Sequence, residues 1–157
     1  MLNSSVWNQR YLQMAHGVAG WSKDPSTKVG AVIIGDKGQV LSTGYNGFPR
    51  GIADSSERLN DRATKYKYVV HAEMNAIYNA SYSGVALAGA TLYVHGLPVC
   101  SECAKGIIQS GITRVVIPAP MMCKDIPDKW KESWELTKSL FAEAGVRCIY
   151  EIFSPQE

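Results

Sequence analysis

The spacing of apolar residues divides the chain into alternating helices and strands. In four segments apolar side chains recur every three or four positions, the period that gives a helix one buried face. Serine before the first segment and glycine after two others match the residues that begin and end helices. The spacing predicts helices from Ser4 or Ser5 to about Trp21, from His71 to about Tyr82, from Ser101 to Ser110 and from Trp130 to Ala144.

Five shorter runs, rich in valine and isoleucine, predict strands. They cover Lys28–Ile34, Gln39–Tyr45, Ala90–His95, Thr113–Ile117 and Val146–Ile152. A glycine-rich turn separates the first two and predicts a hairpin, whereas helices separate the later strands and predict right-handed parallel crossovers. The order of elements therefore predicts an α/β protein in which helices cover a mixed, five-stranded sheet.

Two stretches interrupt this order. Gly44–Gly51 combines glycine with proline and predicts a loop. The polar segment that follows, to about Lys67, shows only a weak helical pattern from Glu57 to Ala63. Insertions of this kind are often functional lids. Because the chain has no repeat, low-complexity tract or evident boundary, we expect a single domain over residues 1–157.

The bulk composition narrows the possible functions. The chain has 157 residues, of which 46% are hydrophobic, as in an ordinary globular domain. Sixteen basic and 14 acidic residues leave a net charge of +2, which favours a small substrate over a nucleic acid. No apolar run is long enough to cross a bilayer and no signal-peptide pattern is present, so we expect a cytoplasmic protein. In that compartment four cysteines indicate metal binding or catalysis before disulfides.

The main chemical pattern joins His71 to a later pair of cysteines. Cys100 and Cys103 are three positions apart at the start of a predicted helix, so both thiols face the same side. The free N–H groups and the dipole of a helix N-terminus favour the thiolate form that zinc requires. His71 begins another predicted helix, so the two helix ends could meet over one ion. Three such ligands would leave the fourth tetrahedral position of zinc open to water.

Glu73 is the candidate acid–base residue. It lies two positions after His71, so its carboxylate should approach the site from a different direction than the imidazole. That placement suits a proton carrier better than a fourth ligand. We therefore expect Glu73 to move a proton from water to the leaving group of the substrate.

Other interpretations of the cysteines and histidines are weaker. Without the histidine and the glutamate, the Cys-x-x-Cys pattern would indicate a thioredoxin-like redox site. A structural zinc site would need a fourth ligand, for which His95 and Cys123 are the candidates. Otherwise His16 and His95 suit surface or packing positions, Cys123 suits a loop and Cys148 suits the core.

These motifs resemble those of the cytidine deaminase superfamily and, within it, of the deoxycytidylate (dCMP) deaminases. The pattern His-Ala-Glu at 71–73 followed by Pro98-x-Cys100-x-x-Cys103 is similar to the zinc-deaminase signature. Further matching stretches are Ser22–Ala31 and Gly44–Gly51. The two motifs also match beyond the signature itself, over His71–Ile77 and Cys100–Lys105. The similarity extends from about Ser22 to about Ile117, and it implies a three-layer α-β-α fold of the cytidine-deaminase type.

Two features bear on how far the resemblance extends. Val99 stands between Pro98 and Cys100, which lengthens the loop by one residue but leaves the metal spacing intact. Residues 52–70 contain no cysteine or histidine for the second, structural zinc that some members bind. We therefore expect one zinc ion per chain.

The resemblance also implies roles for individual residues. It makes the histidine and the two cysteines zinc ligands and makes Glu73 the proton shuttle. Asn46 would hydrogen-bond the sugar, and the backbone N–H of Ala72 would bind the pyrimidine carbonyl. The base pocket would be lined by Val29, Gly30 and Ala31.

Lys23 and Arg50 are the candidates for binding the substrate phosphate. Loops beside the expected site hold both residues, and a phosphate requires charged donors. The alternative, given equal weight, is that both are ordinary solvated surface charges.

The implied reaction is hydrolysis of dCMP to dUMP and ammonia at carbon 4 of cytosine, which supplies dUMP for dTMP synthesis. The alternatives are another cytosine or adenine substrate, such as dCTP, cytidine or a tRNA base, and a non-catalytic, zinc-stabilised nucleotide-binding module. The resemblance further implies a homo-oligomer, with a hexamer favoured. It also implies activation by dCTP and inhibition by dTTP with Mg²⁺, through Gly44–Gly51 and neighbouring insertions.

Overall fold

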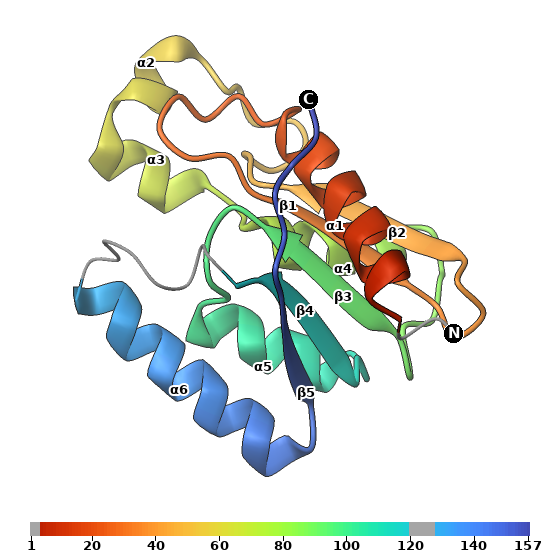
Figure 1. Ribbon diagram of the computed structural model, residues 1–157. Helices are drawn as coiled ribbons and strands as arrows, with labels where there is room; N and C mark the ends of the chain where they lie inside the picture. The colour runs from red at the N-terminus through yellow and green to blue at the C-terminus, as the bar shows by residue number, and fades with distance from the viewer. Residues whose placement is uncertain (1–3, 120–127) are drawn as a thin grey trace.

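The computed structural model describes residues 4–119 and 128–157 (Figure 1). The helices of these residues are α1 (Ser5–Ala19), α2 (Ser56–Asn60), α3 (Arg62–Tyr68), α4 (Ala72–Tyr82), α5 (Ser101–Gln109) and α6 (Asp128–Ala144). The strands are β1 (Gly30–Ile34), β2 (Val40–Tyr45), β3 (Thr91–His95), β4 (Arg114–Pro118) and β5 (Arg147–Glu151). All five predicted strands and all four longer predicted helices are present. None of the described helices has the length and apolar character that a membrane span needs.

The five strands form one mixed sheet in the order β2-β1-β3-β4-β5. β1 pairs antiparallel with β2 and with β3, so the predicted hairpin occupies one edge of the sheet. β3, β4 and β5 run parallel, because α5 and α6 supply the crossovers that parallel neighbours require. The predicted mixed sheet is therefore confirmed.

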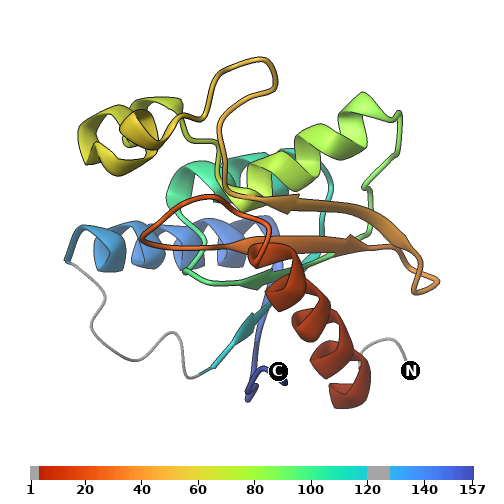
Figure 2. The same ribbon diagram turned by 90° about the horizontal axis from the view of Figure 1, so that it is seen from above.

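Helices cover both faces of this sheet (Figure 2). α1 packs on one face, where Leu12, Val32 and Tyr93 belong to the same core. α4, α5 and α6 lie over the other face, where Ile33 and Ile107 belong to a larger core. Val32 and Ile33 face opposite layers because side chains alternate along a strand. The expected three-layer α-β-α arrangement is thus present.

The insertion between β2 and α4 forms two short helices instead of the single weak helix predicted from Glu57 to Ala63. The break falls at Asp61, whose backbone leaves the helical region with φ −91° and ψ 104°. In both views α2 and α3 project at one end of the layers (Figures 1 and 2). Lys65 is the buried residue of α3, so this helix has one side turned toward the rest of the molecule.

Candidate active site

Two helix N-termini come together near the end of β3. α4 begins directly after His71, and α5 begins directly after Cys100; both residues adopt the extended conformation of an N-cap. Gly106 of α5 allows the two helices to pack closely, since a Cβ at this position would lie 2.5 Å from the sulfur of Met74 in α4. This packing brings the imidazole and the thiols, which are distant in sequence, to one place.

The side chains of His71, Cys100 and Cys103 form a cluster that fits one metal ion. Nδ1 of His71 lies 3.4 Å from the sulfur of Cys100 and 3.4 Å from the sulfur of Cys103. A tetrahedral zinc ion with ordinary bond lengths would hold such nitrogen and sulfur atoms about 3.5 Å apart. Within the described residues, the group contains no fourth histidine, cysteine, aspartate or glutamate. The donor set therefore fits a zinc site with three protein ligands.

Hydrogen bonds within the cluster already favour a thiolate. The Cys103 thiol donates to Cys100 and thereby lowers the pKa of the Cys100 thiol to about 4, and a bond with His71 acts in the same direction. Donating that bond, together with burial, raises the pKa of Cys103. The bond with Cys100 raises the pKa of His71. The backbone N–H of Cys103 also donates to the Cys100 sulfur over 3.4 Å, as expected at a helix N-terminus.

Glu73 lies in the first turn of α4, beside the cluster but outside it. The residue is 3% exposed, and burial raises the pKa of its carboxyl group to about 7, although the nearby imidazole opposes the shift. A carboxyl group that titrates near neutral pH can both accept and return a proton. The acid–base role of Glu73 stays a prediction.

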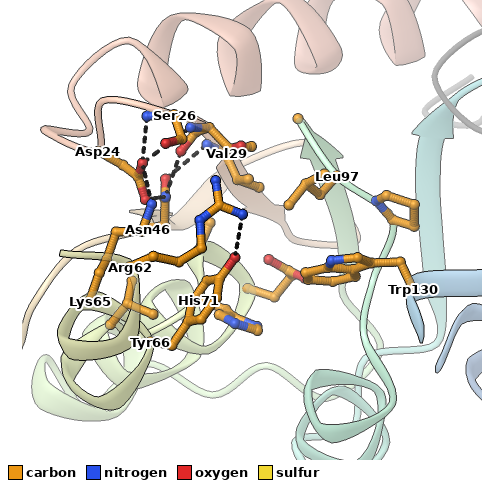
Figure 3. Close-up of a pocket in the computed structure, with 16 residues that line it drawn as sticks. Asp24, Ser26, Val29, Asn46, Arg62, Lys65, Tyr66, His71, Leu97 and Trp130 are labelled. Atoms are coloured by element: carbon orange, nitrogen blue, oxygen red, sulfur yellow. Dashed lines mark hydrogen bonds and ion pairs between the residues drawn. The ribbon is translucent and has the colours of Figure 1, made fainter. Parts of the chain in front are cut away.

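A cavity of about 390 Å³ lies against the cluster (Figure 3). His71 and Glu73 line one part of it, and other parts are lined by the loop from 24 to 29, by α3, by the loop after β3 and by Trp130 of α6. The volume lies within the range of pockets that bind small molecules. The ring of Trp130 lies 6.4 Å from that of His71, so α6 closes one side of the site.

Three of the residues predicted to bind substrate line this cavity. Asn46 is 8% exposed; its side-chain oxygen accepts from the N–H of Val29 over 2.8 Å and its nitrogen donates to the carbonyl of Thr27 over 2.9 Å. The amide oxygen has a second lone pair and can still accept a hydrogen bond from a ligand, whereas the second hydrogen of the NH₂ group is directed to Oδ2 of Asp24 over 3.5 Å. Val29 and Ala72 also line the cavity, and Ala72 begins α4, where N–H groups lack partners within the helix.

The structure does not bring the other predicted binding residues to the cavity lining. Gly30 faces α1, because a Cβ on it would lie 2.0 Å from the carbonyl oxygen of Ala15. Ala31 is fully buried in the core beneath α4–α6. Lys23 is 3.0 Å from Asp54 and lines an adjoining hollow, which shares Asn46 and Lys65 with the cavity lining.

Arg50, the second predicted phosphate ligand, is directed to another part of the surface. It donates a hydrogen bond to Asn79 and lies over the ring of Tyr82, 4.9 Å from its centroid. Its hollow is lined by residues of β2 and α4 and does not include the metal cluster. Neither of the two predicted phosphate ligands lines the cavity, and their assignment stays a prediction.

Several residues that line the cavity were not predicted as site residues from the sequence. Asp24, Arg62, Lys65 and Tyr66 are among them, together with Trp130. Three of these belong to α3, whose polar pattern predicts no buried face. Only the packing of the insertion on the loop before β1 shows that they border the site.

The alternative interpretations of the cysteines fare differently. Cys100 and Cys103 are free thiols rather than a disulfide. His95 packs against His16 and is not part of the metal cluster. Cys123, the other candidate for a fourth ligand, lies outside the described residues. Cys148 is half-buried and packs against the core, as predicted.

Known proteins share these features. Residues 5–119 match the model of a family described as the cytidine and deoxycytidylate deaminase zinc-binding region. An uncharacterized deaminase from Aliivibrio fischeri is 41% identical over 146 residues, which cover 93% of this chain and 94% of the relative. The deoxycytidylate deaminase of Mus musculus is 38% identical over 157 residues, which cover 96% of this chain and 81% of the relative.

Solved structures extend the similarity to the fold. The dCMP deaminase of cyanophage S-TIM5, in complex with dCMP and dUMP, matches with a TM-score of 0.69 at 22% identity, over 90% of this chain and 93% of that one. The same enzyme in apo form matches with a TM-score of 0.68. Since the family match spans the cluster of His71, Cys100 and Cys103, Glu73 and every strand but the last, the chain belongs to the cytidine and deoxycytidylate deaminases, a family of zinc-dependent hydrolases.

Proposed function

We propose that this protein hydrolyses dCMP to dUMP and ammonia in the cytoplasm and thereby supplies dUMP for dTMP synthesis. The observation that carries the proposal is the buried carboxyl group of Glu73, which lines the same cavity as the three-ligand cluster. Relatives named deoxycytidylate deaminase and a fold neighbour that binds dCMP and dUMP support this choice of substrate.

The chain's own residues would divide the work of the reaction. His71, Cys100 and Cys103 would hold a zinc ion, which as a Lewis acid would make a water molecule a better nucleophile at neutral pH. Glu73 would take a proton from the attacking water and return it to the departing amino group, which leaves as ammonia.

The remaining contacts would orient the pyrimidine nucleotide. The N–H of Ala72 would bind the pyrimidine carbonyl, because it lies at the free end of α4 beside Glu73. Asn46 would bind the sugar by accepting a hydrogen bond through the unused lone pair of its side-chain oxygen, and Val29 would contact the base. These contacts would hold carbon 4 of the ring beside the carboxyl group.

Substitution of Glu73 tests the proposal. Glu73→Gln removes the acid–base group but keeps its size, so kcat for dCMP should fall by about 10²-fold or more while zinc content is retained. Glu102→Gln is the matched control, because Glu102 lies between the two cysteines but is exposed and pairs with Lys105 over 2.7 Å. Near-normal turnover by Glu73→Gln would remove this residue from the mechanism.

A substrate panel distinguishes dCMP from the other candidates. Ammonia release is measured with dCMP, dCTP, cytidine, cytosine and a tRNA hairpin, and dCMP should give the highest kcat/KM. Preference for the hairpin would favour a nucleic-acid substrate, and absence of turnover in zinc-loaded protein would favour a binding module. A homo-oligomer, and control by dCTP and by dTTP with Mg²⁺, stay predictions of the family resemblance.

A further inference from the structure

Two of the cations near the cavity already have partners elsewhere. Nζ of Lys23 lies 3.0 Å from Oδ2 of Asp54. Arg50 donates to Asn79 and lies over the ring of Tyr82. Neither side chain lines the cavity that contains Glu73.

Lys65 lines the cavity, but Asp24 neutralises its charge. The Nζ–Oδ1 distance is 3.1 Å, and the two side chains are 6% and 9% exposed. Oδ1 of Asp24 also accepts the backbone N–H groups of Ser26 and Thr27, at 2.8 and 3.1 Å. A buried ion pair with such additional hydrogen bonds holds its segments in fixed positions. Lys65 therefore anchors α3 to the loop before β1.

Arg62 is the other cationic side chain of α3 in the cavity lining. It lies three positions before Lys65, so the two occupy the same side of the helix. Its Nη1 donates to the hydroxyl of Tyr66 over a long 3.5 Å (Figure 3), and it forms no ion pair with a described carboxylate. A guanidinium with unused N–H groups matches the oxygens of a phosphate.

The contacts around Asn46 place Arg62 near the expected 5′ end of a nucleotide. The side-chain nitrogen of Asn46 lies 3.5 Å from Oδ2 of Asp24, next to the ion pair that anchors α3. A nucleotide with its base at Glu73 and its sugar at Asn46 would extend toward α3. Ser26 also lines this part of the cavity and offers a hydroxyl donor.

Resting on the proposed function, we propose that Arg62 binds the 5′-phosphate of the substrate and selects nucleoside monophosphates over nucleosides. Lys65 acts as a positioning residue: its ion pair holds the helix that presents Arg62 to the cavity. The ligand chemistry is thus a phosphate monoester attached to a pyrimidine nucleoside.

The experiment compares Arg62→Gln with the wild type on ligands that differ only in the phosphate. Calorimetry measures binding of dUMP and deoxyuridine, and ammonia release measures KM and kcat for dCMP and deoxycytidine. Loss of charged hydrogen bonds should raise Kd for dUMP and KM for dCMP about tenfold or more. The nucleoside values and kcat should change less than about twofold, because they do not depend on the phosphate contact.

Two further variants control for charge and for folding. Lys67→Gln lies on the same helix but is exposed and absent from the cavity lining, so it should match the wild type. Arg62→Lys keeps the positive charge but loses the planar guanidinium, which can donate two parallel hydrogen bonds to a phosphate. Its Kd for dUMP and KM for dCMP should lie between those of the wild type and Arg62→Gln. Thermal unfolding confirms that each variant is folded.

An unchanged ratio of dUMP to deoxyuridine affinity in Arg62→Gln would overturn the inference. An equal loss for both ligands would also overturn it, since the effect would then not involve the phosphate. Arg62-dependent binding of dUMP without ammonia release would support the inference and reject the proposed reaction. A wild type that deaminates dCMP and deoxycytidine equally well would support the reaction and reject this role for Arg62.

Discussion

Two buried cations in this molecule are stabilised in different ways. Lys65 and Arg114 are each 5% exposed. Lys65 has a carboxylate partner, Asp24, at 3.1 Å. The guanidinium of Arg114 instead donates to neutral oxygens, those of Asn8 at 3.0 Å and of Tyr93 at 3.3 Å, and its Nε has no partner among the described residues. Equal burial therefore does not imply an equal role.

The segments that each cation joins show the difference. The ion pair of Lys65 joins α3 to the loop before β1, and both line the cavity of the candidate active site. The cluster formed by Arg114, Asn8 and Tyr93 joins α1 to the sheet. The side chain of Asn8 also donates to the carboxylate of Glu151 in β5 over 3.1 Å. The residues of this second cluster do not line that cavity. We infer that the first cluster shapes substrate binding, whereas the second stabilises the packing of α1.

Lys65→Met should have the largest effect and should impair both stability and binding. It leaves the buried carboxylate of Asp24 without its cation, a change that typically costs about 3–5 kcal/mol of unfolding free energy. The side chain of Asn46 lies beside Asp24, so KM should rise for dCMP and deoxycytidine alike. This pattern differs from that of Arg62→Gln, which should affect only the nucleotide. Denaturant unfolding and steady-state kinetics measure the two effects.

Adding Asp24→Asn to Lys65→Met is the matched control. An asparagine keeps an acceptor for the backbone N–H groups of Ser26 and Thr27 but carries no charge. The double variant should recover part of the lost stability, because no unpaired carboxylate remains buried. A single Lys65→Met variant with wild-type stability and KM would show that the ion pair does not anchor α3.

Arg114→Met should reduce stability less and leave catalysis unchanged. The oxygens of Asn8 and Tyr93 lose a charged donor, but the nearby carboxylate of Glu151 keeps its hydrogen bonds to other side chains, so the expected cost is about 1–3 kcal/mol. Arg147→Met is the control: Arg147 pairs with Arg114 in the sheet register but is exposed, so its stability should change by less than about 0.5 kcal/mol. A fall in kcat/KM for Arg114→Met without a loss of stability would contradict the inference that only the Lys65–Asp24 pair affects substrate binding.

How much could be predicted from the sequence depends on whether a feature is set by neighbouring residues or by contacts between distant segments. His71, Glu73, Cys100 and Cys103 were recognisable because their pattern is local: two short motifs, each at the start of a periodic segment. The layers of the fold were predictable because helices and strands have different periods. Both kinds of signal lie within a few consecutive residues.

The walls of the cavity depend on which distant segments meet, and no local pattern reports that. Lys65 and Asp24 are 41 positions apart, and Lys65 lies in a segment without a predicted apolar face. The expectation that Gly30 lines the base pocket beside Val29 did not take account of the alternation of side chains, whereas Ala31 lies on the same side as Val29 but is buried in the core. Consecutive strand residues face opposite layers, and Gly30 accordingly faces α1.

The smallest predicted effect concerns His95, which lies on the α1 side of the sheet. Its ring is 4.7 Å from that of His16 in α1 and 5.8 Å from that of Phe153. Burial, with a contribution from the nearby His16, lowers the pKa of His95 to about 4 from an ordinary 6.5. The unfolded chain therefore binds the proton more tightly than the folded protein does. The folded protein therefore has its full stability with respect to His95 above pH 6.5, where the imidazole is neutral in both states. Stability is lost as the pH falls from 6.5 toward about 4, because the unfolded chain takes up the proton first.

His95→Gln should remove that part of the pH dependence. We expect the difference in unfolding free energy between wild type and variant to change by about 1 kcal/mol across this window, because partial exposure screens the charge. Urea unfolding at several pH values measures it. The pKa of Asp24 is also lowered: burial opposes the shift, but hydrogen bonds from Ser26, Thr27 and Lys65 outweigh it. Its stabilisation is lost only in stronger acid, below the unfolded value of about 4. If the unfolding free energies of wild type and His95→Gln changed in parallel with pH, the contact between His95 and His16 of α1 would not contribute to the loss of stability in acid.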